Sequence, residues 1–112
     1  MDPLKTRSRR QPEKTLQLAI ISMLRNKGWL VREMFGTAVQ SGFPDLYATH
    51  SNYGCRWIEI KRAKSYSFTA AQLEWFPKFC ANGSGIWILV AATQSEYEKL
   101  FAKYNWCWYL KG

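Results

Sequence analysis

The order in which helical and strand-like patterns follow one another constrains the fold of this sequence most. Apolar residues recur at helical spacing and predict a helix from about Pro12 to Lys27. Segments rich in aromatic and β-branched residues follow directly and predict three strands, over residues 29–35, 45–50 and 55–62. An opening helix before three consecutive strands favours a mixed α/β sheet protein.

The second half of the chain adds a helix and a buried strand to this unit. The stretch Thr69-Ala70-Ala71-Gln72 matches a capping box and opens a helix, which Pro77 is expected to kink or shorten. The continuous apolar run 86–92 predicts a buried strand. A short helix and a last strand are expected at residues 95–104 and 106–110. The predicted core is therefore αβββαβ, a mixed central sheet flanked by helices.

Composition indicates one basic globular domain. The chain has 112 residues, of which 47% are hydrophobic and 16% aromatic, and this excludes a wholly disordered chain. The net charge is +8, and five of the sixteen Lys and Arg residues lie within the first fourteen positions. We expect a flexible basic arm over residues 1–11 and a single domain over 12–112. A basic surface attracts phosphate backbones and anionic membranes.

The sequence contains neither a targeting pattern nor a metal knuckle, and we therefore expect a cytoplasmic protein. No apolar run approaches the roughly 18 residues of a membrane span, and no signal-peptide pattern follows the basic N-terminus. We therefore expect a soluble protein without a membrane partner. The three cysteines, Cys55, Cys80 and Cys107, are too far apart for a metal knuckle, and we interpret them and the single His50 as structural.

Two scarce carboxylates are expected to converge on one hairpin. A turn centred between Asn52 and Tyr53 sets Asp45 opposite Ile60 and beside Glu59, while Glu59 and Lys61 share one face of their strand. Neighbouring carboxylates repel each other unless a cation lies between them. Mg²⁺ or Mn²⁺ takes oxygen ligands of this kind, and the Ile60 carbonyl is a further candidate ligand. Lys61 is a candidate to stabilise a developing anion or to orient water.

The same residues also have plainer explanations. Asp45 is also explained as a surface residue, with Glu59 and Lys61 as a solvated pair on one strand. Glu13 begins the core-facing stripe of the first helix and can reach the sheet, but it also suits the helix N-terminus as a favourable charge. Gln72 similarly has a capping role available.

Taken together, these residues resemble the PD-(D/E)XK nuclease superfamily, and more closely its VRR-NUC family, the virus-type replication and repair nucleases. The resemblance covers roughly residues 11–92. It rests on a Glu in the first helix, a Gly-x-Pro-Asp turn, a Glu-x-Lys strand and a Gln opening the next helix. These are Glu13, Gly42-Phe43-Pro44-Asp45, Glu59-Ile60-Lys61 and Gln72.

The resemblance implies a restriction-endonuclease-like fold and metal-dependent hydrolysis of phosphodiester bonds. It implies that Asp45 and Glu59 hold Mg²⁺ or Mn²⁺ with the Ile60 carbonyl, and that Glu13 completes the site directly or through water. Lys61 would position the nucleophile, and Gln72 would orient Lys61 or a water. The family includes homodimers that cleave four-way (Holliday) DNA junctions. Stand-alone members of this size resemble phage or bacterial enzymes, which implies the cytoplasm of a bacterial cell or of a phage-infected host.

Basic and aromatic side chains are candidates for contacts with DNA. The expected phosphate contacts are Arg7, Arg9 and Arg10 in the arm and Arg62 and Lys64 after the Glu-x-Lys strand, with Arg32 and Arg56 on neighbouring strands. Each is also explained as a solvated charge. Tyr66 and Phe68 suit either a splayed base or the core. Trp106 and Trp108 are expected on one strand face with Cys107 and Tyr109 on the other, in a covered strand or a subunit interface.

A function from another class remains open. A basic DNA-binding module without catalysis explains the charge, although it leaves the Glu-x-Lys pattern, Asp45 and Glu13 without a task. Metal binding discriminates the two hypotheses.

Overall fold

The computed structural model of the chain describes the backbone of residues 3–34 and 42–110, and side chains within these ranges from Lys14 onward. Four α-helices, a 3₁₀ turn and four strands lie in this part. The helical elements are α1 (Pro3–Asn26), α2 (Ala70–Ala81), α3 (Gln94–Glu98), η1 (Lys99–Phe101) and α4 (Trp106–Leu110). The strands are β1 (Leu30–Glu33), β2 (Leu46–His50), β3 (Gly54–Ile60) and β4 (Ile86–Leu89).

The four strands form one mixed sheet in the order β1-β2-β3-β4. The first three strands pair antiparallel, whereas β4 pairs parallel to β3 after the connection through α2. The order of elements up to β4 confirms the predicted αβββαβ core with a mixed sheet. Because β2 and β3 are joined by a tight turn, the start of β2 and the end of β3 lie at the same end of the sheet.

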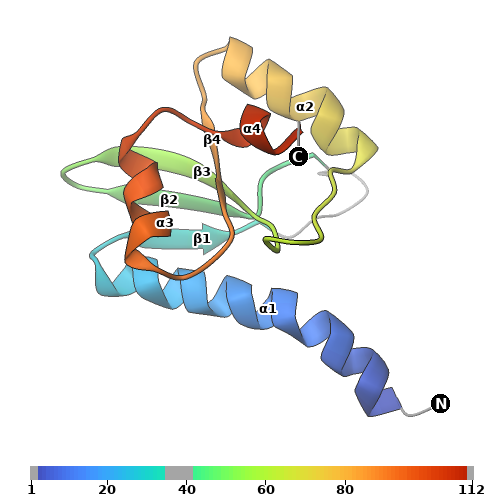
Figure 1. Ribbon diagram of the computed structural model, residues 1–112. Coiled ribbons are helices and arrows are strands. Elements are labelled where there is room, and N and C mark those ends of the chain that lie inside the picture. Colours follow the sequence, from blue (N-terminus) through green and yellow to red (C-terminus); the bar gives the residue numbers. More distant parts are fainter. Residues whose placement is uncertain (1–2, 35–41, 111–112) are drawn as a thin grey trace.

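Helices cover the two faces of the sheet (Figure 1). Ile20 and Leu24 of α1 pack with Leu100 of η1 against one face, where Ala48 and Ile58 are fully buried. On the opposite face a second cluster joins α2 and α4 to β4, through Phe76, Trp106, Ile86 and Ile88. Within the described ranges, α1 and the other helices lack the long apolar stretch that would cross a bilayer.

Helix α1 begins earlier than the sequence pattern predicts. It starts at Pro3 rather than at Pro12, so residues 3–11 of the expected arm have helical backbone. A proline is well tolerated in the first turn of a helix, and Pro3 meets this condition as well as Pro12 does. The apolar periodicity begins only at Leu16, which is why it predicts the later start.

The predicted last strand, residues 106–110, is wrong. This segment is helix α4, and Trp106 and Trp108 therefore do not share a strand face. The preceding residue explains the difference, because the Asn105 side chain pairs with the backbone of β4. Its Oδ1 accepts the Ile88 N–H at 2.6 Å, and its Nδ2 donates to the Ile88 carbonyl at 3.2 Å. An amide side chain thus takes the place that a fifth strand would occupy, and Trp106 is buried against Phe76.

The β2–β3 register differs by one residue from the predicted one. Leu46 pairs with Ile58, and the other pairs follow the same register to His50 and Gly54. Continued by one residue, this register places Asp45 level with Glu59 rather than with Ile60. The two carboxylates are therefore closer than the sequence predicts.

Of the two expected effects of Pro77, a kink or a shortening of α2, the shortening is wrong. The helix continues to Ala81. Proline removes one backbone hydrogen bond, the one that its N–H would donate to the Leu73 carbonyl. Leu73 and Pro77 are both exposed, so water can satisfy that carbonyl.

We predict that Asn105→Ala destabilises the protein by about 2 kcal/mol, because it strips both hydrogen bonds from the Ile88 backbone. Equilibrium unfolding in urea measures this loss. Asn82→Ala is the matched control, since its amide donates only to the exposed Lys78 carbonyl. An equal loss in both variants would contradict the role assigned to Asn105.

Candidate active site

A tight turn fixes the backbone that leads to Asp45. Gly42 has a φ of +94°, in the left-handed region that favours glycine, and a Cβ there would lie 2.7 Å from Cδ1 of Trp75. Pro44 is fully buried, and the backbone carbonyl of Asp45 accepts the Met34 N–H at 2.8 Å. The Gly-x-Pro-Asp sequence thus seats Asp45 between α2 and the sheet.

One hydrogen bond links Asp45 to Glu59, and a second links Asp45 to the next residue of the strand, Ile60. The Asp45 N–H donates to Oε1 of Glu59 at 3.1 Å, and the Ile60 N–H donates to Oδ2 of Asp45 at 2.8 Å. The structure therefore brings together two of the predicted metal ligands, at the start of β2 and the end of β3. Asp45 is half-buried, whereas Glu59 is 3% exposed.

The pKa of Glu59 is raised to about 7, chiefly by burial and also by the negative charge of Asp45. Lys61 and Gln72 oppose this rise through charge and hydrogen bonding. The opposition is incomplete, so the pKa of Glu59 stays above its usual value of 4.5.

Lys61 is buried and held by three acceptors. Its Nζ lies 3.1 Å from Oε2 of Glu59, 2.7 Å from the Ser67 carbonyl oxygen and 3.2 Å from Oε1 of Gln72. The ammonium also lies 4.8 Å from the centre of the Phe68 ring. These contacts fix one orientation of a side chain that is usually flexible, and they direct its charge into the site.

Gln72 has both of the roles that the sequence left open. Its Oε1 accepts the Thr69 N–H at 3.0 Å, and the Gln72 N–H donates to Oγ1 of Thr69, which confirms the capping box. Its Nε2 donates to Oε2 of Glu59 at 2.8 Å. The cap of α2 and the acidic pair are therefore joined through a single side chain.

The chemistry of these donors fits a hard divalent cation. Two carboxylates meet here, one of them buried, and carboxylate and carbonyl oxygens are the ligands that Mg²⁺ and Mn²⁺ prefer. Among the side chains that the structure describes, no three His, Cys, Asp or Glu residues gather closely enough to hold a metal ion. Any third acidic ligand thus has to come from elsewhere in the chain.

Several predicted residues lie outside the described side chains. Glu13, the expected third carboxylate, is in α1 one turn before Gln17, but its side chain is outside the described part. The same holds for the expected phosphate contacts Arg7, Arg9 and Arg10, and the loop residues 36–41 are also outside.

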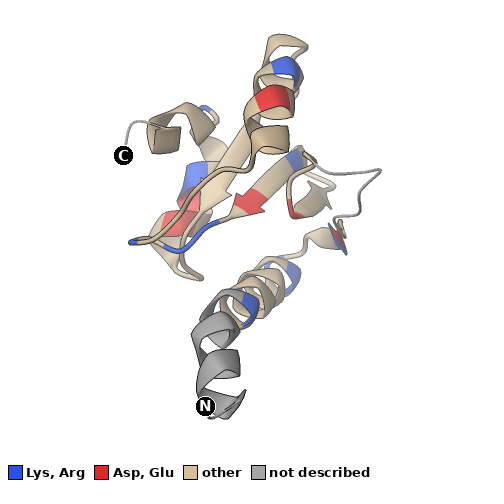
Figure 2. Cartoon of the chain, turned by 90° about the vertical axis from the view of Figure 1, so that its right-hand side faces the viewer, with Lys and Arg blue, Asp and Glu red and all other residues tan. Residues whose placement is uncertain are grey.

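Arg62 and Lys64 lie on the loop that leaves β3 directly after the acidic pair. Figure 2 shows acidic and basic positions adjoining where this strand runs into the loop. Lys64 is exposed and Arg62 half-buried. Both therefore lie at the edge of the candidate site.

Arg56 does not belong to that edge. Its Nε donates to the Leu100 carbonyl at 2.8 Å, and Nη1 donates to the carbonyls of Tyr53 and Cys55. It joins η1 to the turn at the opposite end of the β2–β3 hairpin. Arg32 is exposed on β1, where it lines a hollow together with Glu33 and Tyr47.

The aromatic candidates separate into buried and exposed groups. Phe68 packs against Phe76 and Trp106, as the core interpretation predicts. Tyr66 is half-buried against Tyr109, whereas Trp108 is 77% exposed. Trp108 is therefore not covered by the other described residues of this chain.

Sequence analysis missed Ser67, whose carbonyl oxygen is the shortest contact of Lys61. A backbone acceptor leaves no signal in residue type, so no pattern would have revealed it. Thr69 was identified for its capping motif alone, and its backbone N–H proves to hold the amide oxygen that Lys61 also contacts.

Comparison with known proteins identifies a solved structure with a similar fold. No family model matches the chain, and no curated protein sequence matches it either. A solved structure described as a VRR_NUC domain is similar, with a TM-score of 0.66 and 20% sequence identity. The similarity covers 82% of this chain and 97% of that one. The chain thus has the fold that the motif resemblance predicts.

We predict that Asp45→Asn stabilises the metal-free protein above neutral pH. The pKa of Glu59 is raised on folding, so its contribution to stability is complete well below pH 4.5 and disappears as the pH rises through about 7. Removing the Asp45 charge lowers that pKa, and a gain on the order of 1 kcal/mol is expected at about pH 8, with little at about pH 5. Thermal unfolding at both pH values in EDTA measures the difference. A gain that does not depend on pH would contradict the coupling of the two carboxylates.

We predict that Gly42→Ala displaces Asp45 as well as destabilising the fold. A left-handed alanine costs about 1–2 kcal/mol, and the new Cβ also meets Trp75. Gly83→Ala is the matched control, since Gly83 has a φ of +91° with nothing within 4 Å of the added Cβ. Both variants should unfold more easily, but only Gly42→Ala should lose stabilisation by Mg²⁺ in a thermal-shift titration. Equal Mg²⁺ responses in the two variants would show that the turn at Gly42 does not position the acidic pair.

Proposed function

We propose that this protein is a metal-dependent nuclease that hydrolyses phosphodiester bonds in DNA. The observation that carries the proposal is that Asp45 is hydrogen-bonded beside Glu59, with Lys61 held against Glu59, on the fold of a VRR_NUC domain. The net charge of +8 suits a polyanionic substrate.

The residues divide the work of the reaction between them. Asp45, Glu59 and the Ile60 carbonyl would hold the cation, and Glu13 would complete its ligands directly or through water. When bound, Mg²⁺ or Mn²⁺ supplies Lewis-acid stabilisation of the charge that develops on the scissile phosphate. Lys61, oriented by Gln72 and the Ser67 carbonyl, places a fixed positive charge beside the attacking water.

Basic residues around the site would position the DNA backbone. Arg62 and Lys64 are at the edge of the site, and Arg7, Arg9 and Arg10 add positive charge from the N-terminal part of the chain. Contacts of this kind fix the register of the substrate but read no sequence.

The family resemblance extends the proposal to branched DNA. A homodimer with two-fold symmetry presents two sites to the two matching strands of a four-way junction. The natural setting proposed on the same grounds is the cytoplasm of a bacterial cell or of a phage-infected host.

We predict metal-dependent cleavage of a labelled four-way junction, assayed beside its matched linear duplex with Mg²⁺, Mn²⁺ or EDTA. Asp45→Asn, Glu59→Gln and Glu13→Gln should each lower the rate about 100-fold or more while DNA binding survives, since each removes a cation ligand. Glu74→Gln is the matched control, because Glu74 is an exposed carboxylate on α2 that pairs only with Lys78.

The products separate the possible outcomes. Paired cuts in the junction alone support the dimeric, junction-specific enzyme, whereas equal cutting of both substrates retains the nuclease and rejects the specificity. Binding without cutting in either metal would instead identify a non-catalytic DNA-binding module. Undiminished cleavage by the Glu59→Gln variant would reject the site.

A further inference from the structure

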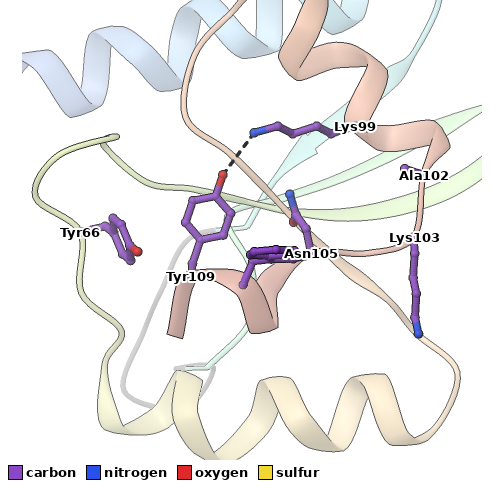
Figure 3. A pocket seen from close by; sticks show the side chains of 7 residues that line it. Tyr66, Lys99, Ala102, Lys103, Asn105 and Tyr109 are labelled. Carbon is purple, nitrogen blue, oxygen red and sulfur yellow. Dashed lines mark hydrogen bonds between the residues drawn. The ribbon is translucent and has the colours of Figure 1, made fainter. Parts of the chain in front are cut away.

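A hollow separate from the candidate active site lies beside the loop that positions Lys61. It has a volume of about 450 Å³ and is lined by side chains of three segments (Figure 3). The main lining residues are Tyr66, Lys99, Lys103, Asn105, Trp108 and Tyr109. A smaller hollow of about 270 Å³ also has Tyr66 and Tyr109 in its wall, so the two adjoin.

The aromatic side of this hollow is unusually exposed. Trp108 is 77% exposed, more than any other large apolar side chain that the structure describes. Tyr66 and Tyr109, by contrast, are fixed against each other with ring centres 5.3 Å apart. A rigid tyrosine pair beside an open indole provides flat apolar surfaces, and such surfaces suit the face of an unpaired base.

The positive side of the hollow has one anchored lysine and one accessible lysine. Lys99 forms an ion pair with Glu96 and donates to the Tyr109 hydroxyl at 3.2 Å, so its charge is largely compensated within the protein. Lys103 is exposed, and its ammonium lies 5.8 Å from the Tyr104 ring centre. Of the two lysines that line the hollow, Lys103 is thus the one whose charge is exposed to a ligand.

The hollow is joined to the candidate active site through the chain itself. Tyr66 in its wall immediately precedes Ser67, whose carbonyl oxygen accepts the Lys61 ammonium at 2.7 Å. A ligand against Tyr66 therefore lies one residue from the backbone that orients Lys61. A DNA strand passing the acidic pair would have this hollow as its neighbour.

We propose that this hollow binds an unpaired nucleotide of the DNA substrate, with the base against Trp108 and its phosphate at Lys103. The inference rests on the proposed nuclease function and adds a substrate class: DNA with a single-stranded extension or an unpaired nucleotide near the cut. The combination of aromatic rings with a lysine favours a nucleotide over a purely apolar partner.

The test measures binding in EDTA, where no cleavage occurs. Fluorescent duplexes, one blunt and one with a single-stranded extension, are titrated with wild-type protein and variants. Trp108→Leu should weaken binding of the extended duplex about tenfold, the effect of losing one stacked base, while Trp108→Phe retains most of it. Lys103→Ala should weaken the same complex and lower its salt dependence by about one counterion. Lys78→Ala, an exposed lysine on α2, controls for net charge.

Each outcome decides the inference. Selective loss on the extended duplex supports it, whether or not the wild-type protein cleaves DNA. Equal weakening on both duplexes, or no effect of Trp108→Leu, overturns it even where cleavage is normal. Sedimentation of wild type and Trp108→Leu completes the test, because a change in oligomeric state would make this surface an interface between copies of the chain.

Discussion

The buried carboxylate of Glu59 is the group on which the arrangement of the site depends. Burial is the main reason why its pKa is raised to about 7, and a buried charge requires partners from the fold. The fold supplies them from three directions: the Asp45 backbone, the Lys61 ammonium and the Gln72 amide. Each partner belongs to a different segment, and their convergence fixes how β2, β3 and α2 meet.

Gln72 shows how a local folding signal and a chemical site share one residue. A capping box normally stabilises a helix start by about 1 kcal/mol and needs no tertiary partner. Here the same amide also contacts Glu59 and Lys61, so the start of α2 is set relative to the end of β3. Displacing either element would therefore disturb the charge balance of the other.

Periodicity and spacing predicted the core well because they report local geometry. The helical spacing of the first segment, the capping box and the two-residue alternation around Glu59 each depend on neighbours in sequence. The errors arose where the structure depends on a contact between separate segments or on the geometry of a turn. Asn105 pairs with β4 and leaves residues 106–110 free to form a helix, and the turn geometry shifted the hairpin by one residue. Ser67 contributes through its backbone, which residue type does not encode.

The residues of the candidate site were predicted from the sequence, whereas their burial and the pKa shift of Glu59 follow only from the structure. Asp45, Glu59, Lys61 and Gln72 were all identified in the sequence, and they meet in one place. Burial and the charge of Asp45 raise the pKa of Glu59, and residue type reveals neither effect. Arg56 was a candidate phosphate contact, but its guanidinium already donates to three backbone carbonyls. A basic residue type does not reveal such contacts.

The side chains that pair with β4 also limit how the sheet can grow. Asn105 occupies both polar backbone groups of Ile88, and Glu96 accepts the Val90 N–H at 2.8 Å. An incoming strand, from another copy or from an aggregate, would have to displace these groups before it could pair there. At the other edge, Arg25 already holds the Val31 carbonyl. Self-association of this protein is thereby directed away from edge-to-edge sheet extension and toward contacts between side-chain surfaces.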